Sequence, residues 1–537
     1  MSTGLVSGPD IVAAMGLGYK GSGSIPFKQR CVSVKVPGLA YFRLRVHITE
    51  LIFVAGLPAL ATVAFAGLTA GFFAWYFVLI PRHNEVLASL GLPLAIAAGV
   101  VVALWLWVSY SRYFARRTNI RLEHSLRYDA TSWAAIALLW LTFLLPLSIT
   151  HSGRALLIAA GTFAVIKLLI AMRFNQTVRE VTIDFALTRL AIIVIAELAA
   201  VTIGQRAGTH VAESSNLLLA VWGRWDAVHY LDIATQGYFG TDMAFFPLYP
   251  TLIAILGRLA GNHLVAGMLI SNIAFFFGLL YFYKLVEHEF NRSVARRAIF
   301  YVSIFPTAVF FSAVYTEALF FALTVASFYY IRGHEWLLGG LIGFFAALTR
   351  VEGVLLIVPF GIEWWNAYRA GQRGLARPLV GGSLIPLGLL AYMMYLWVLR
   401  GDALYFSHVQ AHWHRHFAPP WVSVAQAFHL IFTAHLPQTV ANKALELSFT
   451  FLMLAVLIAG YKRLRPSFSV YMGLSILMPM STSSLMSMPR FALVLFPMFA
   501  ILALWGGRAS VNNAIVALTL PLLGLYTVLF ANWYWVA

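Results

Sequence analysis

Long apolar segments recur along most of this chain, and they constrain its fold more than any single motif does. A helix that crosses the hydrocarbon core of a bilayer needs about 20 apolar residues. Backbone polar groups within lipid must be satisfied inside the segment, which helices achieve. We therefore expect an all-α polytopic membrane protein with about 15 transmembrane helices. The expected spans are 51–80, 92–110, 131–149, 155–172, 183–206, 264–283, 298–313, 318–331, 336–349, 351–364, 379–399, 446–461, 468–481, 491–506 and 511–531.

The composition excludes a soluble enzyme. Of the 537 residues, 61% are hydrophobic and 11% are charged, whereas soluble domains carry about 25% charged residues. The net charge of +17 would suggest nucleic acid in a soluble protein, but in a membrane protein Lys and Arg collect in cytoplasmic loops beside anionic lipid. We expect membrane lipids and no nucleic acid as partners. With Cys31 as the single cysteine, neither an intramolecular disulfide nor a thiolate metal site can form.

Clusters of Lys and Arg indicate which loops face the cytoplasm. They all fall on one side if the N-terminus is cytoplasmic and 247–260 is not a full span. The opposite side then holds loops 207–250 and 400–445, together with the polar corners near 315–317, 349–352 and 481–490. The basic residues are Arg112, Arg116, Arg117, Arg121, Arg127, Arg173, Arg179, Lys284, Arg292, Arg296, Arg297, Arg369, Arg373, Arg377, Lys462, Arg463, Arg465 and Arg508.

The same pattern divides the chain into three parts. Residues 1–46 are polar and basic and lack the apolar core of a cleaved signal peptide, so we expect a cytoplasmic segment. Residues 47–175 are expected to form an N-terminal four-helix membrane unit. Residues 176–537 hold the remaining spans and both long outer loops, and we expect the function to reside there.

The segment after the fifth span places an acid among aromatic residues. Asp226 follows Trp225, and on a helix it would share a face with His229 and Tyr230, whereas Asp232 would lie on another face. A carboxylate can deprotonate an acceptor hydroxyl, and the aromatic rings offer stacking surfaces for a sugar. The alternative is an interfacial helix whose Trp and Tyr residues belong to the aromatic belt. The segment by itself leaves both interpretations open.

Three further charged residues stand at the outer ends of expected spans. Glu317 can contact substrate or cap the next helix. Arg350 can clamp a phosphate bidentately, or it can pair with Glu352 or Glu317. Arg490 is a second arginine at the outer end of an expected helix. Because two arginines on one surface suit a phosphate-linked lipid, we expect substrate contacts from Glu317, Arg350 and Arg490.

Loop 400–445 contains histidines at a spacing of four residues. His408, His412 and His416 would lie on one face of a helix, which is a metal-ligand spacing. No nearby carboxylate or cysteine other than Asp402 is available to complete a metal-ligand set. We therefore favour substrate contacts from His408 and Gln410 over a metal site. We expect no cofactor, and the requirement for a divalent metal stays open.

No nucleotide-binding glycine loop and no Ser-His-Asp order occurs in the sequence. A soluble nucleotide-sugar domain is also missing. If the protein uses a sugar donor, the membrane itself must present that donor.

From about 183 to 531 the sequence resembles the PIG-V type mannosyltransferases, the GPI mannosyltransferase 2 family of the GT-C glycosyltransferase class. The motifs that carry the resemblance share one order and one expected membrane side. They are Trp225-Asp226 with His229-Tyr230, Gly237-Tyr238, Phe246-Pro247-Leu248-Tyr249-Pro250, Phe305-Pro306 with Tyr315-Thr316-Glu317, Thr349-Arg350 with Gly353, and Pro489-Arg490-Phe491 with Phe496-Pro497.

The resemblance implies a GT-C-like multi-span helical bundle over 176–537. It also implies inverting transfer of a sugar, typically mannose, from a polyprenyl- or dolichyl-phosphate donor to a lipid-linked or glycan acceptor. The reaction would take place on the extracytoplasmic or lumenal side. The family pattern maps its catalytic base onto Asp226 and its phosphate-holding residues onto Arg350 or Arg490. The N-terminal four-helix unit has no place in that pattern.

Together these observations predict an integral-membrane glycosyltransferase of glycolipid biosynthesis. It would lie in the bacterial plasma membrane or, in a eukaryote, in the endoplasmic reticulum membrane. The alternative is a transporter or flippase of lipid-linked sugars, which charged pairs near the bilayer midplane would favour. Polar motifs gathered at one face favour an active site that opens to lipid.

Overall fold

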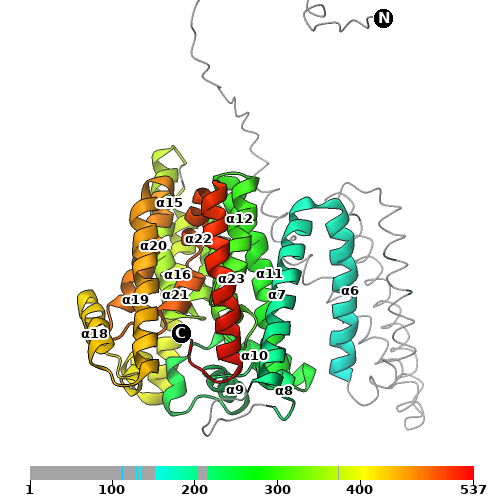
Figure 1. The fold of residues 1–537 in the computed structure, drawn as a ribbon. Coiled ribbons are helices and arrows are strands. Elements are labelled where there is room, and N and C mark those ends of the chain that lie inside the picture. Colours follow the sequence, from blue (N-terminus) through cyan, green and yellow to red (C-terminus); the bar gives the residue numbers. More distant parts are fainter. Residues whose placement is uncertain are drawn as a thin grey trace, which may run out of the picture. The chain divides into compact units, whose positions relative to one another are not determined.

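The computed structural model describes residues 152–203, 214–372 and 374–536, together with three isolated positions, Arg112, Asp129 and Ala134. All of them belong to the compact unit Leu51–Ala537, drawn in Figure 1. In these described ranges the regular elements are α- and 3-10 helices, and the one β-type pairing is an isolated bridge between Phe417 and Thr482. The all-α class expected from the sequence is therefore confirmed.

The expected segment 1–46 and the expected spans 51–80, 92–110 and 131–149 lie outside the described residues. Of the N-terminal four-helix unit, only its last helix is described. The division of the chain at 175 therefore stays a prediction.

Six helices of the described region are long and apolar enough to cross a membrane. A seventh span results if two short helices, which meet at an angle of 73°, are counted as one. The expected number of about 15 spans is not confirmed. The six helices are α6 (Ser152–Phe174), α7 (Gln176–Thr202), α11 (His263–Glu289), α16 (Ala376–Arg400), α19 (Pro437–Gly460) and α23 (Ala509–Ala531), and the bent pair is α21 (Met488–Val494) and α22 (Phe496–Trp505).

Several other expected spans are short or broken. Residues 298–313 do not form one helix, because Pro306 has no amide hydrogen and clashes with the preceding turn. Residues 351–364 likewise begin as a 3-10 helix. Such irregular backbone is tolerated at membrane depth where protein surrounds it. The remaining elements are α8 (Leu217–Ala220), α9 (Ala227–Gln236), η4 (Gly240–Ala244), α10 (Leu248–Ala260), α12 (Arg292–Ser303), η5 (Ala308–Phe311), α13 (Glu317–Arg332), α14 (Trp336–Ala347), η6 (Val351–Leu356), α15 (Ile357–Arg369), α17 (Tyr405–His408), η7 (Val409–Trp413), α18 (Pro420–Thr433), η8 (Tyr461–Arg463) and α20 (Pro466–Met480).

Small residues allow α14 and α16 to approach closely. A Cβ atom added to Gly340 would collide with the carbonyl group of Gly381, and one added to Gly388 would collide with the carbonyl oxygen of Phe344. Helices in lipid associate through such close packing, since lipid tails are as apolar as their side chains. This contact supports η6, which packs against both helices.

The polar corners and the basic loops lie at opposite ends of the helices. α13 begins at Glu317 and ends at Arg332, so its two ends are about 24 Å apart at 1.5 Å per residue. At the far end, Arg332 pairs with Glu289 (2.6 Å) and with Glu363 (2.9 Å), and Glu289 also pairs with Arg465. The near end, with α8 and α9 in Figure 1, carries the motifs singled out above.

A buried arginine inside α7 stabilises the break between α12 and η5. The Nη1 and Nη2 groups of Arg189 donate to the carbonyl oxygens of Ala308 and Ser303, each at 2.8 Å. The hydroxyl of Ser303 in turn donates to Asp184 at 2.7 Å. Ser303 ends α12 and Ala308 begins η5, and water is not available in the membrane to satisfy their carbonyl oxygens. Arg189 thus caps a helix end that the sequence interrupts.

We expect Arg189→Met to destabilise the protein, because it leaves the carbonyl oxygens of Ala308 and Ser303 without their buried donor. Leaving a buried acceptor without its hydrogen-bond partner typically costs about 1–3 kcal/mol. Thermal unfolding of the detergent-solubilised protein measures the effect as a lower Tm. Arg179→Met, at an exposed position of the same helix, is the matched control. Equal Tm values for the two variants would refute the capping role.

Candidate active site

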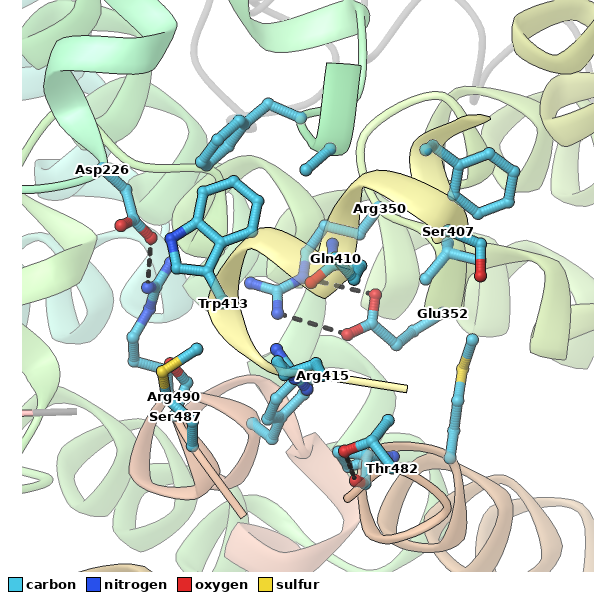
Figure 2. Close-up of a pocket in the computed structure, with 18 of the residues that line it drawn as sticks. Asp226, Arg350, Glu352, Ser407, Gln410, Trp413, Arg415, Thr482, Ser487 and Arg490 are labelled. Carbon is cyan, nitrogen blue, oxygen red and sulfur yellow. Dashed lines mark hydrogen bonds and ion pairs between the residues drawn. The ribbon is translucent and has the colours of Figure 1, made fainter. Parts of the chain in front are cut away.

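Three carboxylates and two arginines form a continuous chain of ion pairs at the polar end of the helices. Arg490 donates from Nη1 to Asp226 Oδ2 at 2.5 Å and from Nε to Glu317 Oε1 at 2.7 Å. Arg350 donates from Nη1 to the same Glu317 oxygen at 3.0 Å and from Nη2 to Glu352 Oε1 at 3.2 Å. Figure 2 shows the Asp226–Arg490 and Arg350–Glu352 pairs. Glu317, which is fully buried, bridges the two arginines.

Aromatic rings surround both guanidinium groups. Arg490 lies 4.8 Å from the ring centre of Tyr315 and 5.2 Å from that of Phe310, while Arg350 lies 5.2 Å from that of Phe491. Burial and the nearby Asp226 raise the pKa of the Tyr315 hydroxyl well above its usual value, so this hydroxyl stays neutral. Cation–π contacts and ion pairs together offset the desolvation of the arginines.

Unusual backbone conformations precede both members of the Asp226–Arg490 pair. Trp225 has φ = 56° and Ser487, which precedes α21, has φ = 70°. Such left-handed conformations cost non-glycine residues about 1–3 kcal/mol and persist only where the surroundings enforce them. The ring of Trp225 packs edge-on against Trp533 and Trp535, with centroids 5.6 and 5.3 Å away. Packing of this C-terminal tail therefore helps to fix the position of Asp226.

A cavity of about 1570 Å³ opens beside the ion-pair chain. Typical ligand pockets enclose about 300–1,000 Å³, so this cavity has room for two substrates at once. Its wall includes both charged and aromatic side chains. Those labelled in Figure 2 are Asp226, Arg350, Glu352, Ser407, Gln410, Trp413, Arg415, Thr482, Ser487 and Arg490.

The structure brings together most residues that the sequence singled out. Those that line the cavity are Trp225, Asp226, His229, Tyr230, Arg350, His408, Gln410 and Arg490. Glu317 is the exception, because it lies behind the cavity wall and both of its ion pairs are with arginines. Among the alternatives for Glu317 and Arg350, the structure therefore shows the ion pair.

The helix expected to carry His408, His412 and His416 on one face is wrong. α17 ends at His408, η7 follows as a 3-10 helix, and His414 then turns the chain with φ = 53°. His408 instead pairs through Nδ1 with Asp402 at 2.7 Å, and this hydrogen bond lowers the pKa of Asp402. Across the described ranges, no three His, Cys, Asp or Glu side chains gather in a metal-binding arrangement.

Sequence reasoning missed one polar face of the cavity and one arginine. Four polar residues lie at positions i, i+3, i+4 and i+7 in the first half of α19, which places them on one face of the helix. This periodicity within an apolar segment could have identified the face from the sequence. The arginine, Arg415, belongs to the histidine-rich loop, and no periodic pattern of residues in the sequence distinguishes it. The α19 residues are Thr439, Asn442, Lys443 and Glu446.

The fold and the cavity define a class: an all-α membrane protein with a large, charged cavity at one end of its helices. The family model described as Mannosyltransferase (PIG-V) matches residues 163–358, which supports the assignment to the PIG-V mannosyltransferases. The match confirms the resemblance seen in the motifs, and it includes Asp226, Glu317 and Arg350. The chain is therefore a membrane glycosyltransferase. No curated protein matches the chain significantly.

Gly353 lies in η6 where this helix packs closely on α14. A substitution there tests whether this packing holds Arg350 in position. A Cβ atom at Gly353 would collide with the backbone of Ala346 and Ala347, whereas nothing lies within 4 Å of one at Gly361. We expect Gly353→Ala to displace the segment that carries Arg350 and to cost about 1–3 kcal/mol, as overpacking does. Gly361→Ala, inside α15, should be neutral or slightly stabilising. Tm and sugar-transfer rates measure both, and an unchanged Gly353→Ala variant would contradict the packing argument.

Proposed function

We propose that this protein transfers mannose, with inversion, from a polyprenyl-phosphate donor to a hydroxyl group of a lipid-linked or glycan acceptor. The observation that carries the proposal is the Asp226 carboxylate on the cavity wall, held by Arg490 at 2.5 Å. A family of mannosyltransferases supplies the reaction class. The cavity supplies a place where a base, an acceptor and a lipid-borne donor can meet.

Asp226 is suited to act as the general base. Its Oδ2 accepts from Arg490, while its Oδ1 makes no hydrogen bond to another described residue. Its carboxylate does not cap α9, so one oxygen remains for a ligand. In the proposed step the acceptor oxygen attacks C1 of the sugar and its proton passes to Asp226. The bond between C1 and the phosphate oxygen breaks, and its electron pair leaves with the phosphate.

The two arginines expected to hold the phosphate have other partners. All three nitrogens of Arg350 donate to Glu317 or Glu352, and two nitrogens of Arg490 donate to Asp226 and Glu317. We therefore assign both arginines to positioning these carboxylates. Their charge still acts on the phosphate through the low-dielectric site.

The distribution of basic residues supports an extracytoplasmic or lumenal site. The cavity lies at the ends of the helices opposite the Arg332–Glu289–Arg465 cluster. Lys and Arg favour the cytoplasmic ends of spans. A lipid-borne donor also suits a site at this end, where the sugar can reach the cavity while its chain stays in the bilayer.

We expect Asp226→Asn to lower transfer by at least about 10²-fold, the lower range of general-base contributions. The amide keeps the size of the side chain but cannot accept the proton. The assay supplies purified protein with radiolabelled polyprenyl-phosphate mannose and a lipid extract as acceptor. The Tm of the variant serves as the folding control. Unchanged transfer in a folded Asp226→Asn protein would remove Asp226 as the base.

Cysteine labelling in intact cells tests the sidedness. Starting from Cys31→Ser, a cysteine at exposed His412 beside the cavity should react with a membrane-impermeant maleimide. A cysteine at exposed Lys462, near the other helix ends, should react only after the membrane is opened. The reverse pattern would overturn the topology and leave the chemistry of the cavity untouched.

A further inference from the structure

Arg415 lines the cavity, and no described carboxylate forms an ion pair with it. Arg350 and Arg490, on the same wall, each bind two carboxylates. No described residue forms an ion pair or a side-chain hydrogen bond with Arg415, and its Nε is buried without a partner. Burial lowers the pKa of Arg415 more than Glu352 and Glu446 raise it. Since arginine stays protonated in proteins, the fold keeps a desolvated cation that a bound anion would stabilise.

The backbone on both sides of Arg415 is fixed by one serine. Ser483 donates from Oγ to the carbonyl oxygen of His414 at 3.0 Å and from its amide to that of His416 at 2.9 Å. The amide of His416 donates back to the Ser483 hydroxyl at 3.2 Å. Ser483 is buried, so the segment is pinned to the turn between α20 and α21. A binding group held in this way is preorganised.

The geometry of displacement explains why a separate cation is needed. Inversion requires the attacking oxygen and the leaving phosphate to lie on opposite faces of the sugar. Arg490 binds the base directly, so it stands on the acceptor side of the sugar. In Figure 2, Arg415 lies beside the Arg350–Glu352 pair and away from Asp226. A phosphate bound at Arg415 would leave the sugar between it and Asp226.

We propose that Arg415 binds the phosphate group of the polyprenyl-phosphate donor and of the polyprenyl-phosphate product. This inference rests on the proposed function and names the residue that receives the leaving group. As the bond between C1 and oxygen breaks, the phosphodiester monoanion becomes a phosphomonoester with one more negative charge. The guanidinium donates N–H bonds to the oxygen that gains the electron pair, where charge-assisted bonds are strongest.

The test measures binding separately from transfer. Purified full-length protein is titrated with a polyprenyl monophosphate and with the same polyprenol lacking phosphate. We expect Arg415→Gln to weaken binding of the phosphorylated lipid about 10–100-fold, the range for a lost hydrogen bond to a charged group. Binding of the polyprenol should not change. Arg400→Gln, an exposed arginine that does not line the cavity, is the matched control and should bind both lipids normally.

Asp226→Asn separates this inference from the proposed function. It should lose transfer while keeping its affinity for the phosphorylated lipid. If wild-type protein binds both lipids equally, the donor class in the proposed function fails. If wild-type protein prefers the phosphorylated lipid and Arg415→Gln keeps that preference, the role of Arg415 is overturned and the proposed function stands.

Arg415→Lys covers the case in which Arg415→Gln does not fold. Lysine keeps the charge but lacks the planar fork of donors. A measurable loss of affinity confined to the phosphorylated lipid supports the inference. Wild-type affinity in Arg415→Lys, with Arg415→Gln unfolded, would assign Arg415 to folding and overturn it.

Discussion

The rest of the site depends on the ion pairs that the fully buried Glu317 carboxylate makes with two arginines. One of its oxygens accepts from Arg350 and from Arg490, residues that belong to two distant segments of the chain. Without Glu317, two desolvated cations would face each other, and a broken buried pair is strongly destabilising. Its place at the first turn of α13 adds the favourable field of a helix N-terminus. The position of Asp226 follows, because Arg490 also holds that carboxylate.

Sequence alone could locate the site but could not assign its pairings. Asp226, Arg350 and Arg490 stood out because charges are costly in a membrane chain and are retained for a reason. Whether Arg350 binds phosphate or carboxylate depends on which side chains the fold brings within 3–4 Å, and periodicity does not contain that information. Arg415 was missed for the same reason, since lacking a partner is a property of the folded chain. Hydropathy also gives the length of an apolar segment, but it does not show whether the segment forms one continuous helix. For this reason it missed the break at Pro306 in the expected span 298–313.

The buried charges in α7 bear on the transport alternative. Asp184 and Arg189 are intramembrane charges of the kind that transporters use along a pathway. Here their hydrogen bonds go to Ser303 and Ala308, and neither residue lines the cavity. They stabilise an interrupted helix, so this pair gives no support to a route across the membrane. The charged residues that line the cavity lie at one end of the helices, where an active site that opens at the membrane surface would be expected.

The backbone around the cavity is strained where the charged groups must be placed. In the described part of the chain, four of the five non-glycine residues with positive φ belong to this region: Trp225, His414, Ser487 and Trp533. Trp225 directly precedes Asp226, His414 directly precedes Arg415, and Ser487 lies one turn before Arg490. Folding energy is thus used to fix the Asp226 carboxylate and the cations in place. Such preorganised charges need not reorient as the transition state forms, which is how an electrostatic site accelerates a reaction.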